Sequence, residues 1–296
     1  MLISKKRYDG LLWTDPRKYD KMDTKGIETV RRDNCALVRN VVTTCLEKVL
    51  IEQDVDGAVS YVKKMISDLL QNKLDMSMLV VTKELSKTNY AAKQAHVELA
   101  EKMRKRDAAT APQLGDRIPY VIIKGMKGAK AYEKAEDPIY ALENNLAIDY
   151  QHYVEHHLTL PLLRIFEPIL KNPKSLLVGE HTRKVVNPTS KAGGGMMGFL
   201  KVGAKCLGCK APIPKGGGNL CKHCKSQEAS IYSREIEGLR ELEADFNKLW
   251  TQCQRCSGSL HQDVLCTARD CPIFYRRKKC QVDLVEKQEK IKGFSW

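Results

Sequence analysis

The chain has 296 residues, and its 50 Lys and Arg outnumber its 36 Asp and Glu to give a formal net charge of +14. Hydrophobic residues at 43% and charged residues at 29% favour a folded chain and exclude wholesale disorder. Because no apolar run approaches the roughly 18–20 residues that a bilayer-spanning helix needs, we expect no membrane partner. The basic excess favours a polyanionic partner, with nucleic acid as the first candidate.

The amino-terminal residues predict a strand over residues 2–4, a basic stretch that ends in Tyr8, and a turn at Asp9-Gly10. A domain rarely opens on a strand that starts at its first Met, so we expect these residues to end a domain that begins further upstream. The charges of residues 5–7 follow a very short apolar stretch, which is the wrong order for an export signal.

In the segment that follows, apolar residues mostly recur at the spacing of an α-helix. Asp56 is expected to cap a helix over residues 57–72, and further helices are predicted over residues 75–79 and 90–106. Asp54 and Asp56 form the only Asp-x-Asp of the chain. Its place at a helix start favours a cap over a metal clamp.

Residues 115–120 interrupt this pattern, and β-branched residues predict a strand over residues 120–123. Helix returns over residues 150–170, where Pro161 is expected to kink the helix or to begin a new one. Asn, Pro, Gly and Ser then gather over residues 171–203, a composition typical of a flexible linker that contains a domain boundary.

A long amphipathic helix is predicted over residues 226–252. Its apolar stripe has the period of a helix that packs against another surface, or of a short coiled coil. The stripe consists of Ile236, Leu239, Leu242, Phe246 and Leu249.

Eleven cysteines are many for a chain with no export signal, and a reducing compartment favours metal thiolates over disulfides. Four of them form two tight pairs, and four thiolates in this pattern can close a tetrahedron around one structural zinc ion. His223 lies inside the second pair and is expected to be a surface residue. The predicted zinc ligands are Cys206, Cys209, Cys221 and Cys224.

A second set of four cysteines also predicts a metal. Its last spacing is wider than in zinc ribbons, and Pro272 follows its final cysteine as in iron–sulfur ligation, so spacing alone leaves zinc and a [4Fe–4S] cluster open. Sites with four cysteine ligands are closed, so neither set is expected to be catalytic, and no catalytic residue is predicted elsewhere. Cys35, Cys45 and Cys280 are expected to be ordinary thiols. The second set consists of Cys253, Cys256, Cys266 and Cys271.

Several separated stretches, in their order and spacing, together resemble the B-family DNA polymerases, and the last two are similar to the delta branch of that family. The stretches are residues 5–10, 25–34, 81–85, 94–100, 115–120, 250–256 and 270–275. The resemblance spans nearly the whole chain and is weakest in the predicted linker.

The resemblance implies a mainly α (α+β) fold with a helical polymerase thumb and a cysteine-rich tail. Residues 1–20 would end the palm, residues 21–170 would form the thumb, and residues 171–203 would form the linker. Residues 204–296 would form the C-terminal domain, whose two metal modules are joined by a helix.

The resemblance also implies that the parent protein is a DNA-directed DNA polymerase, a nucleotidyltransferase of nuclear DNA replication and repair. The palm aspartates that hold two magnesium ions in this family are expected upstream of this chain. The chain alone is therefore expected to bind no magnesium and to be inactive. In the family, the residues matched by Lys6 and Tyr8 hold the primer–template duplex from its minor-groove side. The expected DNA contacts are Lys5, Lys6, Tyr8, Arg31 and Arg32.

The two cysteine modules have different implied partners. In the family, the first module holds zinc and supports engagement of the sliding clamp, whereas the second holds a [4Fe–4S] cluster and anchors the regulatory B subunit. The resemblance therefore favours iron–sulfur at the second set, with zinc as the alternative. A stand-alone nucleic-acid-binding zinc adaptor would explain the charge and the cysteine pairs, but not the ordered thumb stretches. A purely structural scaffold would need no basic excess.

Overall fold

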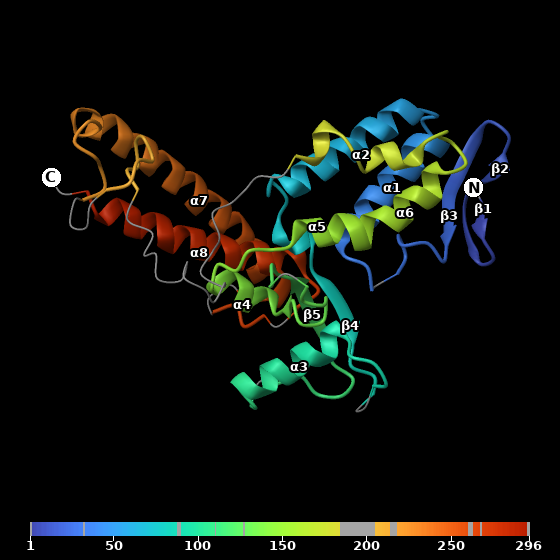
Figure 1. Cartoon of the computed structure of the whole chain (residues 1–296), viewed down its shortest axis with the longest axis horizontal. Helices are drawn as coiled ribbons and strands as arrows, with labels where there is room; N and C mark the ends of the chain where they lie inside the picture. The colour runs from blue at the N-terminus through green and yellow to red at the C-terminus, as the bar shows by residue number, and fades with distance from the viewer. Residues whose placement is uncertain are drawn as a thin grey trace. The chain divides into compact units, whose positions relative to one another are not determined.

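A computed structural model describes residues 2–31, 33–87, 90–109, 111–126, 128–183, 205–213, 218–259, 263–266 and 268–294. About half of the chain is helical and strands are few, which confirms the expected mainly α fold. The chain divides into two compact units, Met1–Ala141 with Leu146–Thr189, and Leu142–Asn145 with Ser190–Trp296. Figure 1 shows the elements of each unit. Among the described residues, no helix combines the length and the apolar character that crossing a membrane requires.

The first unit opens with an antiparallel sheet of order β1-β2-β3. Its strands are β1 (Leu2–Ser4), β2 (Arg7–Asp15) and β3 (Lys18–Lys25). The predicted strand over residues 2–4 is thus confirmed. The long β2–β3 hairpin, which follows it in Figure 1, was not predicted.

The predicted turn at Asp9-Gly10 is wrong, because both residues lie inside β2. Asp9 is buried, and its carboxylate accepts a hydrogen bond of 2.6 Å from the Thr24 hydroxyl on β3. This bond holds the backbone in the strand, although the dipeptide alone is typical of turns. The turn falls instead at residues 5–6, where Lys6 adopts a φ of 67°.

Three helices form the core of the first unit. Helix α1 (Ala36–Leu50) contacts both α2 (Val55–Leu70) and α6 (Thr159–Phe166). Their buried residues recur at intervals of three and four, as expected for helices with one apolar face. They include Leu37, Val38, Val41, Leu46, Val62, Ile66, Leu69, Leu162, Ile165 and Phe166.

Helix α2 begins two residues earlier than predicted. Asp54, rather than Asp56, is the N-cap: its carboxylate accepts a hydrogen bond of 2.7 Å from the Gly57 backbone N–H. The interpretation of the Asp-x-Asp as a cap is therefore confirmed, with the capping residue shifted by two. The cap satisfies one of the N–H groups that a helix start leaves without a helical partner.

The helix predicted over residues 150–170 is one continuous run of three forms. It passes from α5 (Tyr150–His152) through the π-helical η2 (Tyr153–Leu158) into α6. Pro161 lies inside α6 and cannot donate a hydrogen bond to the turn before it. The chain accommodates this by widening the preceding turn, where Thr159 donates its hydroxyl to the Val154 carbonyl at 2.7 Å.

A second antiparallel sheet of order β4-β5-β6 completes the first unit. Its strands are β4 (Val81–Glu84), β5 (Arg117–Ile122) and β6 (Ala135–Glu136), and α3 (Ala95–Arg106) contacts β5 and β6. The strand predicted at residues 120–123 is confirmed and begins earlier. The shorter elements are η1 (Met76–Met78), α4 (Pro138–Glu143), η3 (Pro173–Leu176) and η4 (Glu180–Thr182).

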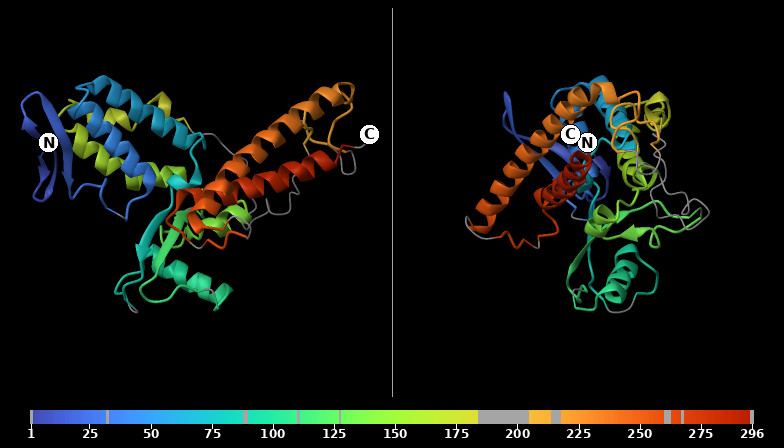
Figure 2. Two further views of the ribbon diagram at one scale, coloured as in Figure 1. Left: turned by 180° about the vertical axis from the view of Figure 1, so that it is seen from behind. Right: turned by 90° about the vertical axis from the view of Figure 1, so that its left-hand side faces the viewer.

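The second unit is built on two long helices, α7 (Glu228–Ser257) and α8 (Pro272–Lys292), which follow the short η6 (Lys225–Gln227). Figures 1 and 2 show α7 and α8 side by side. The pair is antiparallel, because α7 residues of rising number meet α8 residues of falling number. These contacts join Glu235 to Lys287, Leu242 to Cys280, and Trp250 to Arg277.

The predicted amphipathic helix is confirmed in α7, and all five residues of its stripe are partly buried. Helix α8 was not predicted. Its first turns carry adjacent aromatic and basic residues, which do not give a clean apolar stripe.

The cap of α2 gives a test of the first unit. We expect Asp54→Ala to lower the free energy of unfolding by about 1 kcal/mol, because the Gly57 N–H loses its partner. Asp54→Asn keeps an acceptor in the same place and should stay close to the wild type. Urea unfolding followed by circular dichroism measures both. Equal midpoints for Asp54→Ala and Asp54→Asn would contradict the cap.

Candidate metal centres and nucleic-acid interface

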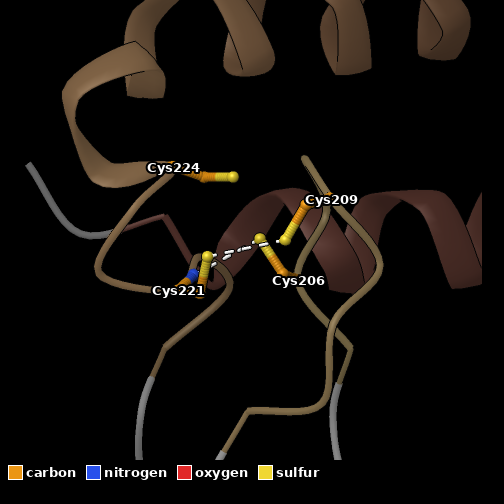
Figure 3. Close-up of side chains that lie close together, drawn as sticks. All are labelled: Cys206, Cys209, Cys221 and Cys224. Carbon is orange, nitrogen blue, oxygen red and sulfur yellow. Dashed lines mark hydrogen bonds between the residues drawn. The ribbon is translucent and has the colours of Figure 1, made fainter.

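The first four cysteines come together at one point. Their sulfur atoms all lie within 4.8 Å of one another, and the Cys209 and Cys221 sulfurs are 3.6 Å apart. Figure 3 shows one pair on each of two loops, with the four side chains turned toward one another. Four sulfurs at about 2.3 Å from a tetrahedral zinc ion lie roughly 3.8 Å apart. The donor set therefore fits a single zinc ion.

Two tight backbone turns present these side chains. In the first, the Cys206 N–H donates to Ala211 O at 2.8 Å, and Lys210 adopts a φ of 62°. In the second, the Cys224 N–H donates to Cys221 O at 3.0 Å. The turns are also linked directly, because the Cys221 N–H donates to the Cys206 sulfur at 3.3 Å.

Gly208 leaves room for the fourth ligand. A Cβ atom at this position would lie 2.8 Å from the Cys224 sulfur and 2.9 Å from Cδ1 of Ile231. Both distances are shorter than ordinary contacts, so a larger residue would push the second pair away from the first.

The electrostatics of this group favour a cation. Burial opposes ionisation of Cys206, but N–H groups of Cys221, Cys209 and Gly208 stabilise its thiolate and lower its pKa to about 6. Hydrogen bonding with Cys221, followed by burial and the other thiols, raises the pKa of Cys224 to about 12. Four thiols this close cannot all ionise unless a positive ion joins them.

A small apolar core supports the site on one side. Cys206 is fully buried, whereas Cys209 is exposed. The core packs both cysteine turns against the start of α7 and the end of α8. It consists of Ile213, Leu220, Ile231 and Phe294, with the partly buried Leu207 and Tyr232 against it.

The second set of cysteines is assembled by the helix pair. Cys253 and Cys256 lie in the last turns of α7, Cys271 is the N-cap of α8, and Cys266 lies in the connection between them. Burial raises the pKa of Cys253, Arg277 lowers it, and the other three cysteines of the set raise it further. Cys256, Cys266 and Cys271 are thus each within electrostatic reach of Cys253.

The second set is more open than the first. Within the described part of the chain, only the first set brings its sulfurs within 4.8 Å of one another. The second set is therefore less compact than the first. A four-iron cube holds its cysteine sulfurs further apart than a single zinc ion does.

The remaining candidate ligands lie apart from both sets. His223 is exposed and does not join the first cluster. Burial raises the pKa of Cys35 to about 11 and that of Cys45 to about 12. Cys280 donates its thiol to the Leu242 carbonyl at 3.4 Å. All three cysteines are suited to a structural role, as expected from the sequence.

The predicted DNA contacts at the amino terminus gather around one turn. Lys5 and Lys6 are exposed between β1 and β2, and Tyr8 follows on β2 with its hydroxyl donating to Asp23 at 3.1 Å. Gly26 fixes this turn: its φ is 67°, and a Cβ there would lie 2.1 Å from the Lys6 carbonyl oxygen. Only glycine combines that conformation with so close a backbone approach.

Of the two arginines predicted to contact DNA, only Arg31 lies among the described residues. Arg31 is half exposed and forms an ion pair with Asp33 at 2.7 Å, which lowers the pKa of that carboxyl. Arg32 lies outside the described residues, as do residues 184–204 of the predicted linker and its surroundings.

A basic groove in the first unit was missed by sequence reasoning. Arg31, Lys83 and Arg117 line a groove of about 520 Å³ together with polar side chains and the acidic Asp33 and Glu84. The antiparallel pairing of β4 with β5 brings Lys83 and Arg117 of this groove together. Both strands carry stretches that resemble the polymerase family, so the signal was present, although their cations had not been singled out.

His96 forms part of the groove wall. It is buried, and Nδ1 of its ring has no hydrogen-bond partner within the described structure. Burial lowers its pKa, and the positive charge of Lys83 lowers it further. The ring is therefore neutral at physiological pH, and the positive charge of the groove comes from its Lys and Arg residues.

The chain was compared with protein-family models. Residues 1–169 match the model of DNA polymerase family B, and residues 206–277 match the C4-type zinc-finger of DNA polymerase delta. The second match contains both cysteine sets.

The comparison with curated proteins gives the same answer. The chain is 62% identical over 299 residues to a DNA polymerase delta catalytic subunit of Oryza sativa subsp. japonica, covering 100% of this chain and 27% of that protein. It is 59% identical to those of Arabidopsis thaliana and Schizosaccharomyces pombe, again over 100% of this chain and 27% and 28% of theirs. The chain thus spans about a quarter of the length of these relatives.

These matches confirm the resemblance found in the sequence. The family-B match covers the first sheet and the helical core, and the zinc-finger match covers the two cysteine sets. The chain therefore belongs to DNA polymerase family B, and it corresponds to the C-terminal portion of the delta catalytic subunits of that family.

Proposed function

We propose that this chain is the duplex-gripping thumb and the partner-binding tail of a replicative DNA-directed DNA polymerase of the nucleus. The observation that carries the proposal is the match over 100% of the chain to delta catalytic subunits at up to 62% identity. A stand-alone zinc adaptor would not explain the family-B match over residues 1–169. In this proposal, the magnesium-binding palm aspartates belong to the rest of the polymerase, and the chain alone synthesises no DNA.

The thumb would hold duplex DNA through its phosphates. The exposed Lys5 and Lys6, beside Tyr8, form one expected contact, and the groove with Arg31, Lys83 and Arg117 forms the other. Lysine and arginine bind phosphate irrespective of base sequence, which suits a polymerase that must follow any template. Arg32 is included on sequence resemblance alone.

The tail would hold two different metal centres. We assign zinc to Cys206, Cys209, Cys221 and Cys224, supported by the compact sulfur cluster and by the zinc-finger match. We assign a [4Fe–4S] cluster to the second set, supported by the proline after Cys271 and by the resemblance to the delta branch of the family. Both centres have four cysteine ligands and therefore serve structure and recognition rather than hydrolysis.

Each centre would support one protein partner. We propose that the zinc module engages the sliding clamp and that the second module anchors the regulatory B subunit. Leu265, next to Cys266, is 93% exposed, and such an apolar side chain is suited to a protein contact. The exposed basic side chains near the start of α8 would surround that contact.

The grip on DNA can be tested with the chain as it stands. We expect weak binding to a primer–template duplex that falls steeply with salt, because phosphate contacts release counterions. Lys83→Ala and Lys6→Ala should each weaken binding by a few fold, whereas Lys64→Ala, an exposed residue of α2, should not. Fluorescence anisotropy at several salt concentrations measures this.

Primer extension provides the complementary measurement. With magnesium and nucleotides, the purified chain should extend nothing. In the anisotropy measurement, duplex binding that does not weaken as salt rises would contradict the proposed phosphate contacts. Extension that survives removal of contaminating polymerases and is lost on Asp54→Asn would contradict both the cap assignment and the inactivity of the chain.

The metals can be tested by colour and composition. Thiolate-bound iron–sulfur clusters absorb visible light, whereas d10 zinc does not. Anaerobically purified protein should be brown and contain iron and zinc. Cys253→Ser or Cys271→Ser should bleach it and leave the zinc, and Cys206→Ser should remove the zinc. Colourless wild-type protein with two zinc ions and no iron would contradict the iron–sulfur assignment.

Gly208 tests the geometry of the zinc site. We expect Gly208→Ala to lose zinc to a chelator at least tenfold faster than the wild type, because the new Cβ displaces Cys224. His223→Ala, an exposed non-ligand inside the second cysteine pair, serves as the control and should keep zinc normally. Release of zinc is followed with a colorimetric indicator. Unchanged release from Gly208→Ala would contradict the close packing.

A further inference from the structure

Arg277 is a buried residue that forms no ion pair within the described part of the chain. The residue is 6% exposed, and its Nε atom is buried with no hydrogen-bond partner. Among the described residues, no carboxylate forms an ion pair with it. Burial of a guanidinium Nε atom without a partner is unfavourable unless nearby charges compensate for it.

Aromatic rings provide only part of that compensation. The Arg277 guanidinium lies 5.3 Å from the ring centroid of Trp250 and 6.0 Å from that of Phe274. Cation–π contacts stabilise a cation, but less than a full negative charge would. The position beside Trp250 is informative, because Cys253 follows Trp250 by three residues on α7 and so lies on the same face.

A second arginine lies in the same region. Arg269 precedes Cys271 by two residues, and its guanidinium lies 5.4 Å from the Phe274 ring. Its Nη1 atom is buried and has no hydrogen-bond partner in the described structure. Two guanidinium groups thus lie near Phe274, and the Arg277 group is within electrostatic reach of the Cys253 thiol.

Metal–thiolate centres provide the missing negative charge. Four thiolates around one zinc ion, or around a [4Fe–4S] core in its 2+ state, leave a net charge of about −2. The burial of unpaired arginine next to Cys253 therefore fits a loaded site better than an empty one. This argument for a loaded site rests on the buried Arg277 Nε atom, which has no hydrogen-bond partner in the described structure. It does not depend on the spacing of the cysteines in the sequence.

We propose that Arg277 is the charge partner of the metal centre at Cys253, Cys256, Cys266 and Cys271. The form of the proposal that involves iron rests on the proposed function of these residues as [4Fe–4S] ligands. Arg277 is a positioning residue and not a ligand: it offsets the negative charge of the centre and holds α8 beside Cys253. When an electrode adds one electron to the cluster, the negative charge grows by one, so Arg277 favours the reduced form and raises the midpoint potential.

Three variants of the full chain test the proposal under anaerobic conditions. Arg277→Met keeps the bulk and removes the charge, Arg277→Lys keeps the charge, and Arg276→Met alters the exposed neighbour on α8. We expect Arg277→Met to lose iron to a chelator at least threefold faster. Its midpoint potential in film voltammetry should fall by about 59 mV, which corresponds to a tenfold change in a one-electron equilibrium.

The other two variants define the cause. Arg277→Lys should restore most of the iron retention and of the potential, and Arg276→Met should match the wild type. One zinc at the first site in every variant shows that the second unit has folded. Wild-type retention and potential in Arg277→Met would overturn the proposal, as would equal iron loss from Arg277→Met and Arg277→Lys.

Failure of the iron–sulfur assignment is recognised separately. Wild-type protein that contains two zinc ions and no iron would refute that assignment. The role of Arg277 would then be tested by how well each variant retains the second zinc ion. Selective loss of that zinc from Arg277→Met, with retention in Arg277→Lys, would support the charge partnership. Retention of both zinc ions in Arg277→Met would overturn it.

Discussion

The repulsion among closely spaced thiolates is the constraint on which the second unit depends. Four cysteine sulfurs within 4.8 Å of one another can all ionise only around a cation. The apolar core beside them is small, and α7 contributes only Ile231, Glu235 and Cys253 as buried residues. A unit with so little buried apolar surface needs further stabilisation, and metal binding is one of the few sources open to it.

The two proposed centres would close the two ends of one helix pair. The first set precedes α7 and packs against Phe294, which follows α8, so it joins the outer ends of the pair. The second set spans the end of α7 and the start of α8. Between the ends, the Glu235–Lys287 ion pair and the Cys280 hydrogen bond fix the alignment of the helices. Metal binding and helix pairing therefore support each other.

Much of this organisation could be predicted because its signals are local. Cysteine pairs at short spacing mark the metal sets, and the α7 stripe is visible within one helix. The sequence-based predictions were wrong or incomplete where contacts between residues far apart in the chain determine the local structure. Asp9-Gly10 is typical of a turn, but the bond from Thr24 keeps it in a strand. The basic groove combines cations from three segments, two of which meet only through the β4–β5 pairing.

The two cysteine sets differ in what their geometry depends on. The first is held by short-range bonds, such as that from the Cys206 N–H to Ala211 O, and its ligand arrangement follows from the turns themselves. The second draws ligands from two helices and their connection, so its arrangement depends on the alignment of α7 with α8. Arg277 lies at that junction, with its guanidinium 5.3 Å from the ring centroid of Trp250 on α7 and 6.0 Å from that of Phe274 on α8. A change in helix alignment would therefore move the second set directly, whereas the first set would be affected through the core that Ile231 and Phe294 form beside it.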